Sequence, residues 1–204
     1  MADPLIGAVI VRHIDELEAA LRHANNSMLP ELSKHAAEVI NSKRKTLGWA
    51  GEVPHDLTQD IWLAPNDWRM DGDTDDSFDL YLELDFTDCI DGQEPETWIG
   101  IFCGFAGAQL RFVFSSNLVG QRDWKTILKA QQELMDKLIA KGFLYDPRTG
   151  ELAVLVQIDR QALADAFEEE DFEVAFQPIS VALDRVNLAR SELDQLVTSI
   201  RKGR

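Results

Sequence analysis

The stretch that most constrains the fold is a strict alternation of apolar and polar residues at positions 79–86. Successive side chains of a strand point to opposite faces, so this pattern predicts a strand with one apolar and one polar face. The inward side chains would be Leu80, Leu82, Leu84 and Phe86, and the outward ones Asp79, Tyr81, Glu83 and Asp85. The chain therefore needs a sheet whose apolar face is covered by other elements.

Further strand signals flank this segment on both sides. Residues 97–105 are apolar on both faces, as expected of a central strand, and residues 110–115 alternate again. The short linker 106–108 fits a hairpin between them. A short strand closed by Pro65 and a strand over 154–158 complete an antiparallel sheet of four to five strands.

Helical spacing of apolar residues accounts for most of the remaining chain. A first helix is expected to end at the "NNS" of 25–27, and its apolar residues are Ile14, Leu17, Ala20, Leu21 and Ala24. Further helices are expected over 30–46, 123–141 and 178–201, and a short one from Asp159 through Phe167. The predicted class is α+β, with helices flanking the sheet.

We expect one domain spanning residues 1–204. It would comprise an N-terminal helical segment at 1–46, a sheet with a central helix at 60–158, and a long amphipathic helix at 178–201. The last helix has apolar residues at heptad-like spacing: Ile179, Leu183, Val186, Leu193, Val197 and Ile200. This stripe predicts either packing on the chain's own sheet or a homodimer through a coiled-coil seam.

Charge is distributed very unevenly along the chain. The net charge is −16, and residues 51–100 contain 15 acidic side chains against the single base Arg69. So negative a surface repels phosphate backbones and anionic lipids, which argues against direct binding to nucleic acid or to a membrane. A basic protein surface is the partner that this composition favours.

The candidate partner-binding residues lie in and beside the alternating strand. Glu83 and Asp85 would stand about 6.6 Å apart in an outward anionic row, which could also mimic a line of phosphates. Two tryptophans bracket the acidic region and would serve as anchors. The full predicted set is Trp62, Asp67, Trp68, Asp79, Tyr81, Glu83 and Asp85.

Metal chemistry is the main enzymatic alternative. Asp71, Asp73 and Asp75 have the D-x-D-x-D spacing of a calcium loop, but Asp76 replaces the required glycine and Leu82 the terminal glutamate. A looser divalent site and a solvated turn stay open, and a metal-dependent hydrolase or nuclease would draw on carboxylates of residues 67–96. No E-x-K grouping for a nuclease and no set of nucleophile, base and orienting residue is present, so we assign no catalytic residue, metal or cofactor.

Taken together, the sequence favours a non-enzymatic interaction module of the inhibitor, immunity, chaperone or adaptor type. No signal-peptide pattern and no apolar run of about 18 residues is present, which favours the cytoplasm. Cys89 and Cys103 are expected to be buried thiols, because they form neither a disulfide framework nor a C-x-x-C metal spacing.

Overall fold

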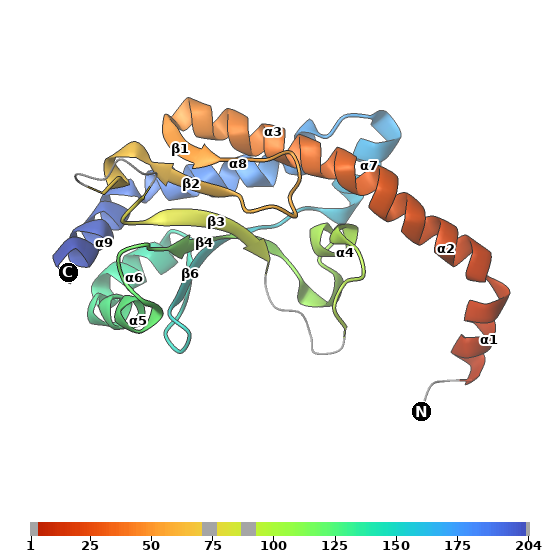
Figure 1. The fold of residues 1–204 in the computed structure, drawn as a ribbon, viewed down its shortest axis with the longest axis horizontal. Helices are drawn as coiled ribbons and strands as arrows, with labels where there is room; N and C mark the ends of the chain where they lie inside the picture. Colours follow the sequence, from red (N-terminus) through yellow and green to blue (C-terminus); the bar gives the residue numbers. More distant parts are fainter. Residues whose placement is uncertain (1–3, 71–76, 87–92, 203–204) are drawn as a thin grey trace.

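The computed structural model describes residues 4–70, 77–86 and 93–202. Its centre is one antiparallel sheet with strand order β1-β2-β3-β4-β6-β5, flanked by helices (Figure 1). The predicted α+β class is confirmed, with one strand more than the upper limit expected. The strands are β1 (Trp49–Glu52), β2 (Trp62–Pro65), β3 (Tyr81–Phe86), β4 (Leu110–Ser115), β5 (Leu144–Asp146) and β6 (Glu151–Val156).

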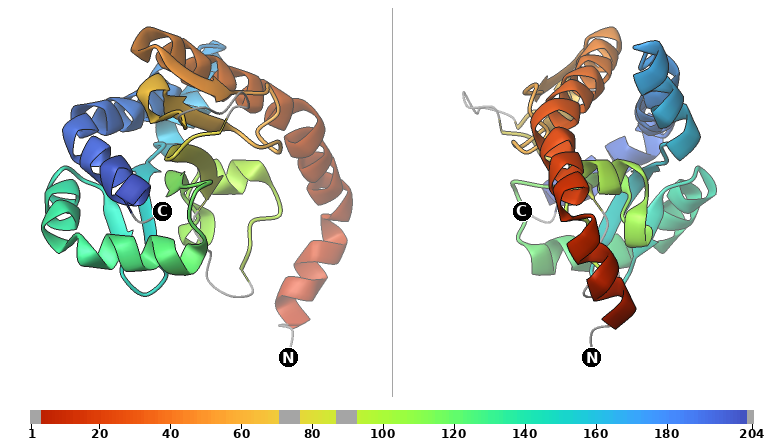
Figure 2. Two further views of the ribbon diagram at one scale, coloured as in Figure 1. Left: turned by 60° about the vertical axis from the view of Figure 1, so that its left-hand side comes forward. Right: turned by 90° about the vertical axis from the view of Figure 1, so that its right-hand side faces the viewer.

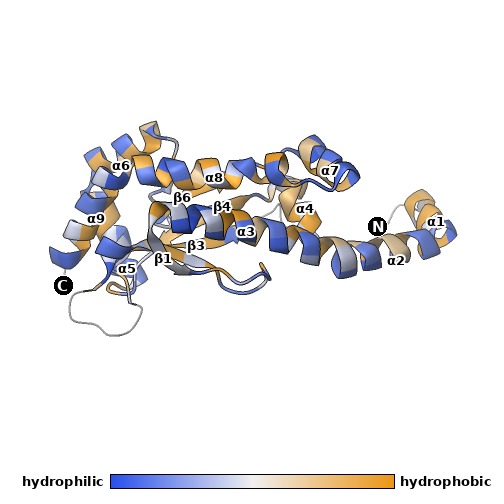
Figure 3. Ribbon diagram, turned by 90° about the horizontal axis from the view of Figure 1, so that it is seen from above, coloured by the Kyte–Doolittle hydropathy of each residue, from blue (hydrophilic) through white to orange (hydrophobic). Residues whose placement is uncertain are grey.

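Helices precede, interrupt and follow the strands. The α-helices are α1 (Pro4–Arg12), α2 (Ile14–His23), α3 (Leu29–Leu47), α4 (Trp98–Phe102), α5 (Gln121–Ala130), α6 (Gln132–Ala140), α7 (Arg160–Glu169), α8 (Glu173–Leu188) and α9 (Arg190–Lys202). Helices α3 and α8 lie side by side over the sheet (Figures 1 and 3). Leu63, Leu82 and Phe114 are consecutive cross-strand partners and are almost fully buried, so they form part of this covered apolar face.

The prediction of a strand over 97–105 is wrong. The segment forms the short helix α4, whose N-cap Thr97 accepts a hydrogen bond from the backbone N–H of Gly100 at 3.3 Å. Beyond α4 the backbone has positive φ at Gly104 (68°), Ala106 (50°) and Gly107 (85°), which no extended strand adopts. The predicted hairpin at 106–108 is therefore also absent, and β4 pairs directly with β3.

Two predicted helix boundaries are wrong, each for its own physical reason. At Ala24–Met28 the chain stays helical as a π-helical turn, which absorbs an extra residue without ending the helix. Pro178 lies inside α8 instead of opening it. A proline there removes one backbone hydrogen bond, but the neighbouring Phe176 and Ile179 are buried in the core and offset that loss. Tertiary packing overrides the local breaker in this case.

The apolar stripe near the C-terminus packs inside the molecule. The chain bends at Ala189, so the predicted single helix is in fact α8 followed by α9. All six stripe residues are at most 3% exposed, namely Ile179, Leu183, Val186, Leu193, Val197 and Ile200. They pack in the chain's own core and are not available for a seam with a second copy.

The N-terminal cap of α7 provides a test of local stability. The Asp159 side chain accepts a hydrogen bond from the backbone N–H of Ala162 at 2.8 Å. We expect Asp159→Ala to lower the free energy of unfolding by about 1 kcal/mol, because one N–H at the start of the helix loses its partner. Urea unfolding followed by tryptophan fluorescence measures this loss. Asp159→Asn retains an oxygen acceptor, so an equal loss in both variants would contradict the capping role.

Candidate functional site

Three of the predicted interface residues lie on the outward side of β3. Tyr81, Glu83 and Asp85 are partly exposed and stand opposite residues of β4. Both carboxylates of this row, however, have a partner on β4. Glu83 accepts a hydrogen bond from the Ser115 hydroxyl at 2.8 Å, and Asp85 pairs with the guanidinium of Arg111 at 2.9 Å.

The groups around this row include a cation shared with a third strand. Arg111 also pairs with Glu151 of β6 at 2.5 Å, so one cation links three strands. Burial raises the pKa of the Tyr81 phenol and the charge of Glu83 adds to the effect, which keeps the hydroxyl protonated. Trp62 lies opposite Glu83 in the register, with its ring centroid 5.3 Å from that of Phe78. The row is thus only partly compensated, because the single cation Arg111 lies among the carboxylates of Glu83, Asp85 and Glu151.

The expectation that Asp79 faces outward is wrong. Asp79 is only 2% exposed and forms an ion pair with Arg201 of α9, at 2.5 Å between Nε and Oδ2. The chain bends between Phe78 and β3, so that Phe78, Asp79 and Leu80 are all buried. Side chains alternate strictly between the two faces only within a regular strand, and Asp79 lies before the start of β3.

Asp67 and Trp68 belong to the same contact with α9. The Trp68 indole is 1% exposed and donates to Asp194 at 2.7 Å, so it anchors α9 and is not a surface anchor. Arg190 places its guanidinium 4.9 Å from the Trp68 ring centroid and pairs with Asp67 at 3.2 Å. Of these residues, Asp67 has the most exposed side chain.

One sequence signal could have revealed this contact. Arg190 and Arg201 are eleven residues apart, which is close to three full helical turns, so both lie on one side of α9. Basic residues on one side of a helix can pair with acidic ones elsewhere in the chain, and the segment of residues 51–100 is rich in acids. The structure therefore divides the seven predicted residues between an outward sheet surface and an internal helix contact.

Neither metal nor thiol chemistry gains support from the described residues. Asp71, Asp73, Asp75 and Asp76 lie outside them, as does Cys89. Within residues 4–70, 77–86 and 93–202, no group of three His, Cys, Asp or Glu side chains could hold a metal ion. Cys103 is a free, partly buried thiol, and burial raises its pKa despite the opposing influence of Arg160.

The most exposed apolar surface lies at the N-terminal end of the chain. Helices α1 and α2, residues 4–23, form an N-terminal arm that projects away from the sheet and its covering helices (Figures 1 and 2). Eight large apolar side chains of this arm are 43–77% exposed: Leu5, Ile6, Val9, Ile10, Val11, Ile14, Leu17 and Leu21. In contrast to the buried side of α3, no residue of α2 is buried.

Helix α2 has an apolar stripe, and further apolar residues lie on α1. Ile14, Leu17 and Leu21 follow one another at spacings of three and four, so they share one side of α2, whereas Ile10 precedes the break at His13. Apolar colour extends along the arm in Figure 3. The spacing identifies a helix from the sequence, but whether the body of the protein covers its apolar side can be learned only from the structure.

Comparisons with protein-family models, curated proteins and solved structures find no match. Within the described residues, no helix has the length and apolar character needed to span a membrane.

Proposed function

We propose that this protein is a non-enzymatic interaction protein that binds a partner protein through its N-terminal arm. The observation that carries the proposal is the exposure of the eight large apolar side chains defined above. Contiguous exposed apolar surface on an otherwise packed protein marks a place where another molecule binds. Elsewhere in the protein, the apolar side chains are packed together in a well-formed core.

The energetic incentive for binding is substantial. Fully burying one exposed Leu, Ile or Val side chain contributes about 1.5–3 kcal/mol, and those of the arm are already about half covered. Burying the remaining apolar area of several of them would contribute several kcal/mol, against the entropy lost on association. An amphipathic helix laid in an apolar groove is a common way for proteins to use such a stripe.

The polar side of the arm favours a protein over a lipid surface. Helices that lie on membranes are typically rich in Lys and Arg, whereas α2 carries Asp15, Glu16 and Glu18 in its first half. The net charge of −16 would further oppose approach to anionic lipids. The same charge favours a partner with a basic rim around its apolar groove, as an inhibitor or adaptor would encounter.

A matched pair of substitutions tests the arm. We expect Leu17→Asp to weaken partner binding at least tenfold, because it places a carboxylate in the apolar stripe. Ala19→Asp adds the same charge to the opposite, exposed side of α2 and should leave binding within twofold. Affinity capture from the native host with quantitative mass spectrometry identifies proteins that the wild type and Ala19→Asp retain but Leu17→Asp does not. Titration of the purified partner then measures its affinity for each variant.

Two outcomes separate the parts of this proposal. If no captured protein distinguishes Leu17→Asp from Ala19→Asp, the arm is not the binding element. If a partner is found but raising the salt concentration does not slow its association, charge does not assist binding. The expectation that the partner has a basic rim around its groove is then wrong. Circular dichroism of both variants shows whether the fold is unchanged.

A further inference from the structure

Strand β6 has an edge that is only partly covered. On one side, residues 153–156 pair with β4, and on the other, β5 pairs with residues 151–153 alone. Within the described parts of the chain, no strand pairs with residues 154–157 on the side away from β4; we call this segment the open edge. Backbone N–H and C=O groups along such an edge can pair with a further strand.

The open edge lacks the features that usually protect an uncovered strand. Its sequence is Val-Leu-Val-Gln, with no charged residue, no proline and no glycine. Proteins normally protect an unpaired edge with lysine, proline or a bulge, because a bare apolar edge recruits other chains. The sequence of this edge therefore does not oppose the addition of a further strand, and helix α8 is the element that lies beside it.

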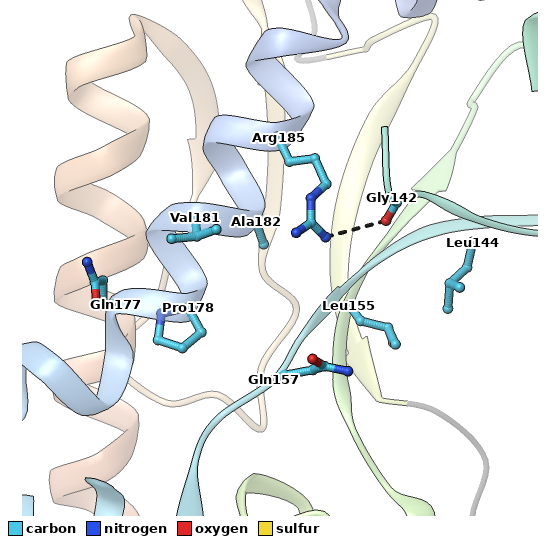
Figure 4. Close-up of a pocket in the computed structure, with 9 residues that line it drawn as sticks. All are labelled: Gly142, Leu144, Leu155, Gln157, Gln177, Pro178, Val181, Ala182 and Arg185. Carbon is cyan, nitrogen blue, oxygen red and sulfur yellow. Dashed lines mark hydrogen bonds between the residues drawn. The ribbon is translucent and has the colours of Figure 1, made fainter. Parts of the chain in front are cut away.

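A groove runs beside the open edge and supplies room for that strand. Its volume is about 350 Å³, with Leu155 and Gln157 on one wall and Pro178, Val181 and Ala182 of α8 on the other (Figure 4). Leu144, at the start of β5, closes one end. Leu144 is 45% exposed and Val181 47% exposed, so the walls offer apolar surface to a bound side chain.

One cation lines the same groove. Arg185 directs its guanidinium toward the carbonyl oxygen of Gly142, at the long distance of 3.4 Å (Figure 4). The preceding Asp184 is already bound by Lys43 at 2.7 Å, and no carboxylate in the described residues forms an ion pair with Arg185. The chain has 36 acidic side chains, but none of those in the described residues pairs with the Arg185 guanidinium. This guanidinium is therefore able to bind a carboxylate of another molecule.

We propose that this groove binds an extended peptide segment of a partner protein, which adds as a strand to the open edge of β6. The peptide backbone pairs with residues 154–157, an apolar side chain packs between Leu155 and Val181, and an Asp or Glu side chain pairs with Arg185. A strand is the occupant that satisfies the backbone groups of the edge, which a helix or a small apolar ligand would leave unpaired. This site is separate from the N-terminal arm and does not depend on it.

A random heptapeptide library displayed on phage tests the groove, because it offers extended peptides of very many sequences. The wild-type protein is used for selection and the Val181→Glu variant for counter-selection, because Val181→Glu places a charge in the groove wall. We expect selected peptides rich in β-branched residues with an Asp or Glu. Val174→Glu is the matched control, since Val174 is exposed on the same helix but does not line the groove.

Selected peptides are then measured as synthetic ligands of the full chain. We expect binding to weaken at least tenfold in Val181→Glu and less than twofold in Val174→Glu. Replacing the peptide's Asp or Glu by its amide should weaken binding at least fivefold, and Arg185→Gln should remove that difference. Those amides of residues 154–157 that point away from β4 should exchange more slowly when peptide is bound, and N-methylation of the peptide backbone should abolish binding.

The proposal is overturned by any of three results. The first is the absence of peptides enriched on the wild type over Val181→Glu. The second is an N-methylated peptide that binds as well as its parent, which would exclude strand addition. The third is exchange protection that maps away from residues 154–157. Identical thermal unfolding of the two valine variants would show that loss of binding is not loss of folding.

Discussion

Replacing Arg201 by methionine is expected to lower the free energy of unfolding by about 3 kcal/mol. The substitution retains much of the aliphatic side chain but removes the cation that pairs with Asp79. The Asp79 side chain is only 3% exposed, so its carboxylate would be left buried without a counter-charge. We expect the lower end of the range for a broken buried pair, because the Arg201 side chain is itself 41% exposed and its removal admits water.

Urea unfolding of matched variants isolates this effect. Lys202→Met removes a positive charge from the adjacent, exposed position and should change the unfolding free energy by less than about 0.5 kcal/mol. The double variant Asp79→Asn with Arg201→Met should regain a large part of the loss, because the buried group is then uncharged. Equal losses in Arg201→Met and Lys202→Met would show that the ion pair contributes little.

The regular strands illustrate what the sequence could predict about the fold. Residues 81–83 and 110–115 alternate in burial because each strand has one side in the core, and this information is local. At the end of β3 the alternation fails: Leu84 is only partly buried and Phe86 is 38% exposed, so the expectation that Phe86 lies in the core is wrong. The prediction fails at 97–105 because the apolar residues there meet the core from a short helix and turns, and apolar content alone does not distinguish helix from strand. Strands β1 and β5 are not predicted from the sequence; they are only four and three residues long, and neither carries a clear periodic signal.

The candidate site is only partly predictable for a different reason. Tyr81, Glu83 and Asp85 follow directly from the alternation, and the structure places them on the outward side of β3. Whether an acidic residue has a cation beside it depends on distant parts of the chain, as with Asp79 and Arg201, 122 residues apart. The uncovered arm and the open edge of β6 are likewise properties of the assembled fold.

The second large effect is expected at Gly51, where Gly51→Ala should destabilise the protein by about 3 kcal/mol through backbone strain and overpacking. Gly51 has φ of +147°, a conformation that residues with a side chain rarely adopt. A methyl group there would also overlap the carbonyl oxygen of Trp62 on the paired strand β2, and backbone atoms cannot rotate away as a side chain can.

Gly48→Ala separates the cost of backbone conformation from the cost of steric overlap. Gly48 also has positive φ (66°), but a methyl group there would meet nothing within 4 Å. We expect Gly48→Ala to cost only about 1 kcal/mol, the penalty for a left-handed conformation at the end of α3. Urea unfolding followed by tryptophan fluorescence measures both variants. Similar losses at the two glycines would mean that β1 shifts away from β2 at little cost, and the close approach of these strands would then not limit stability.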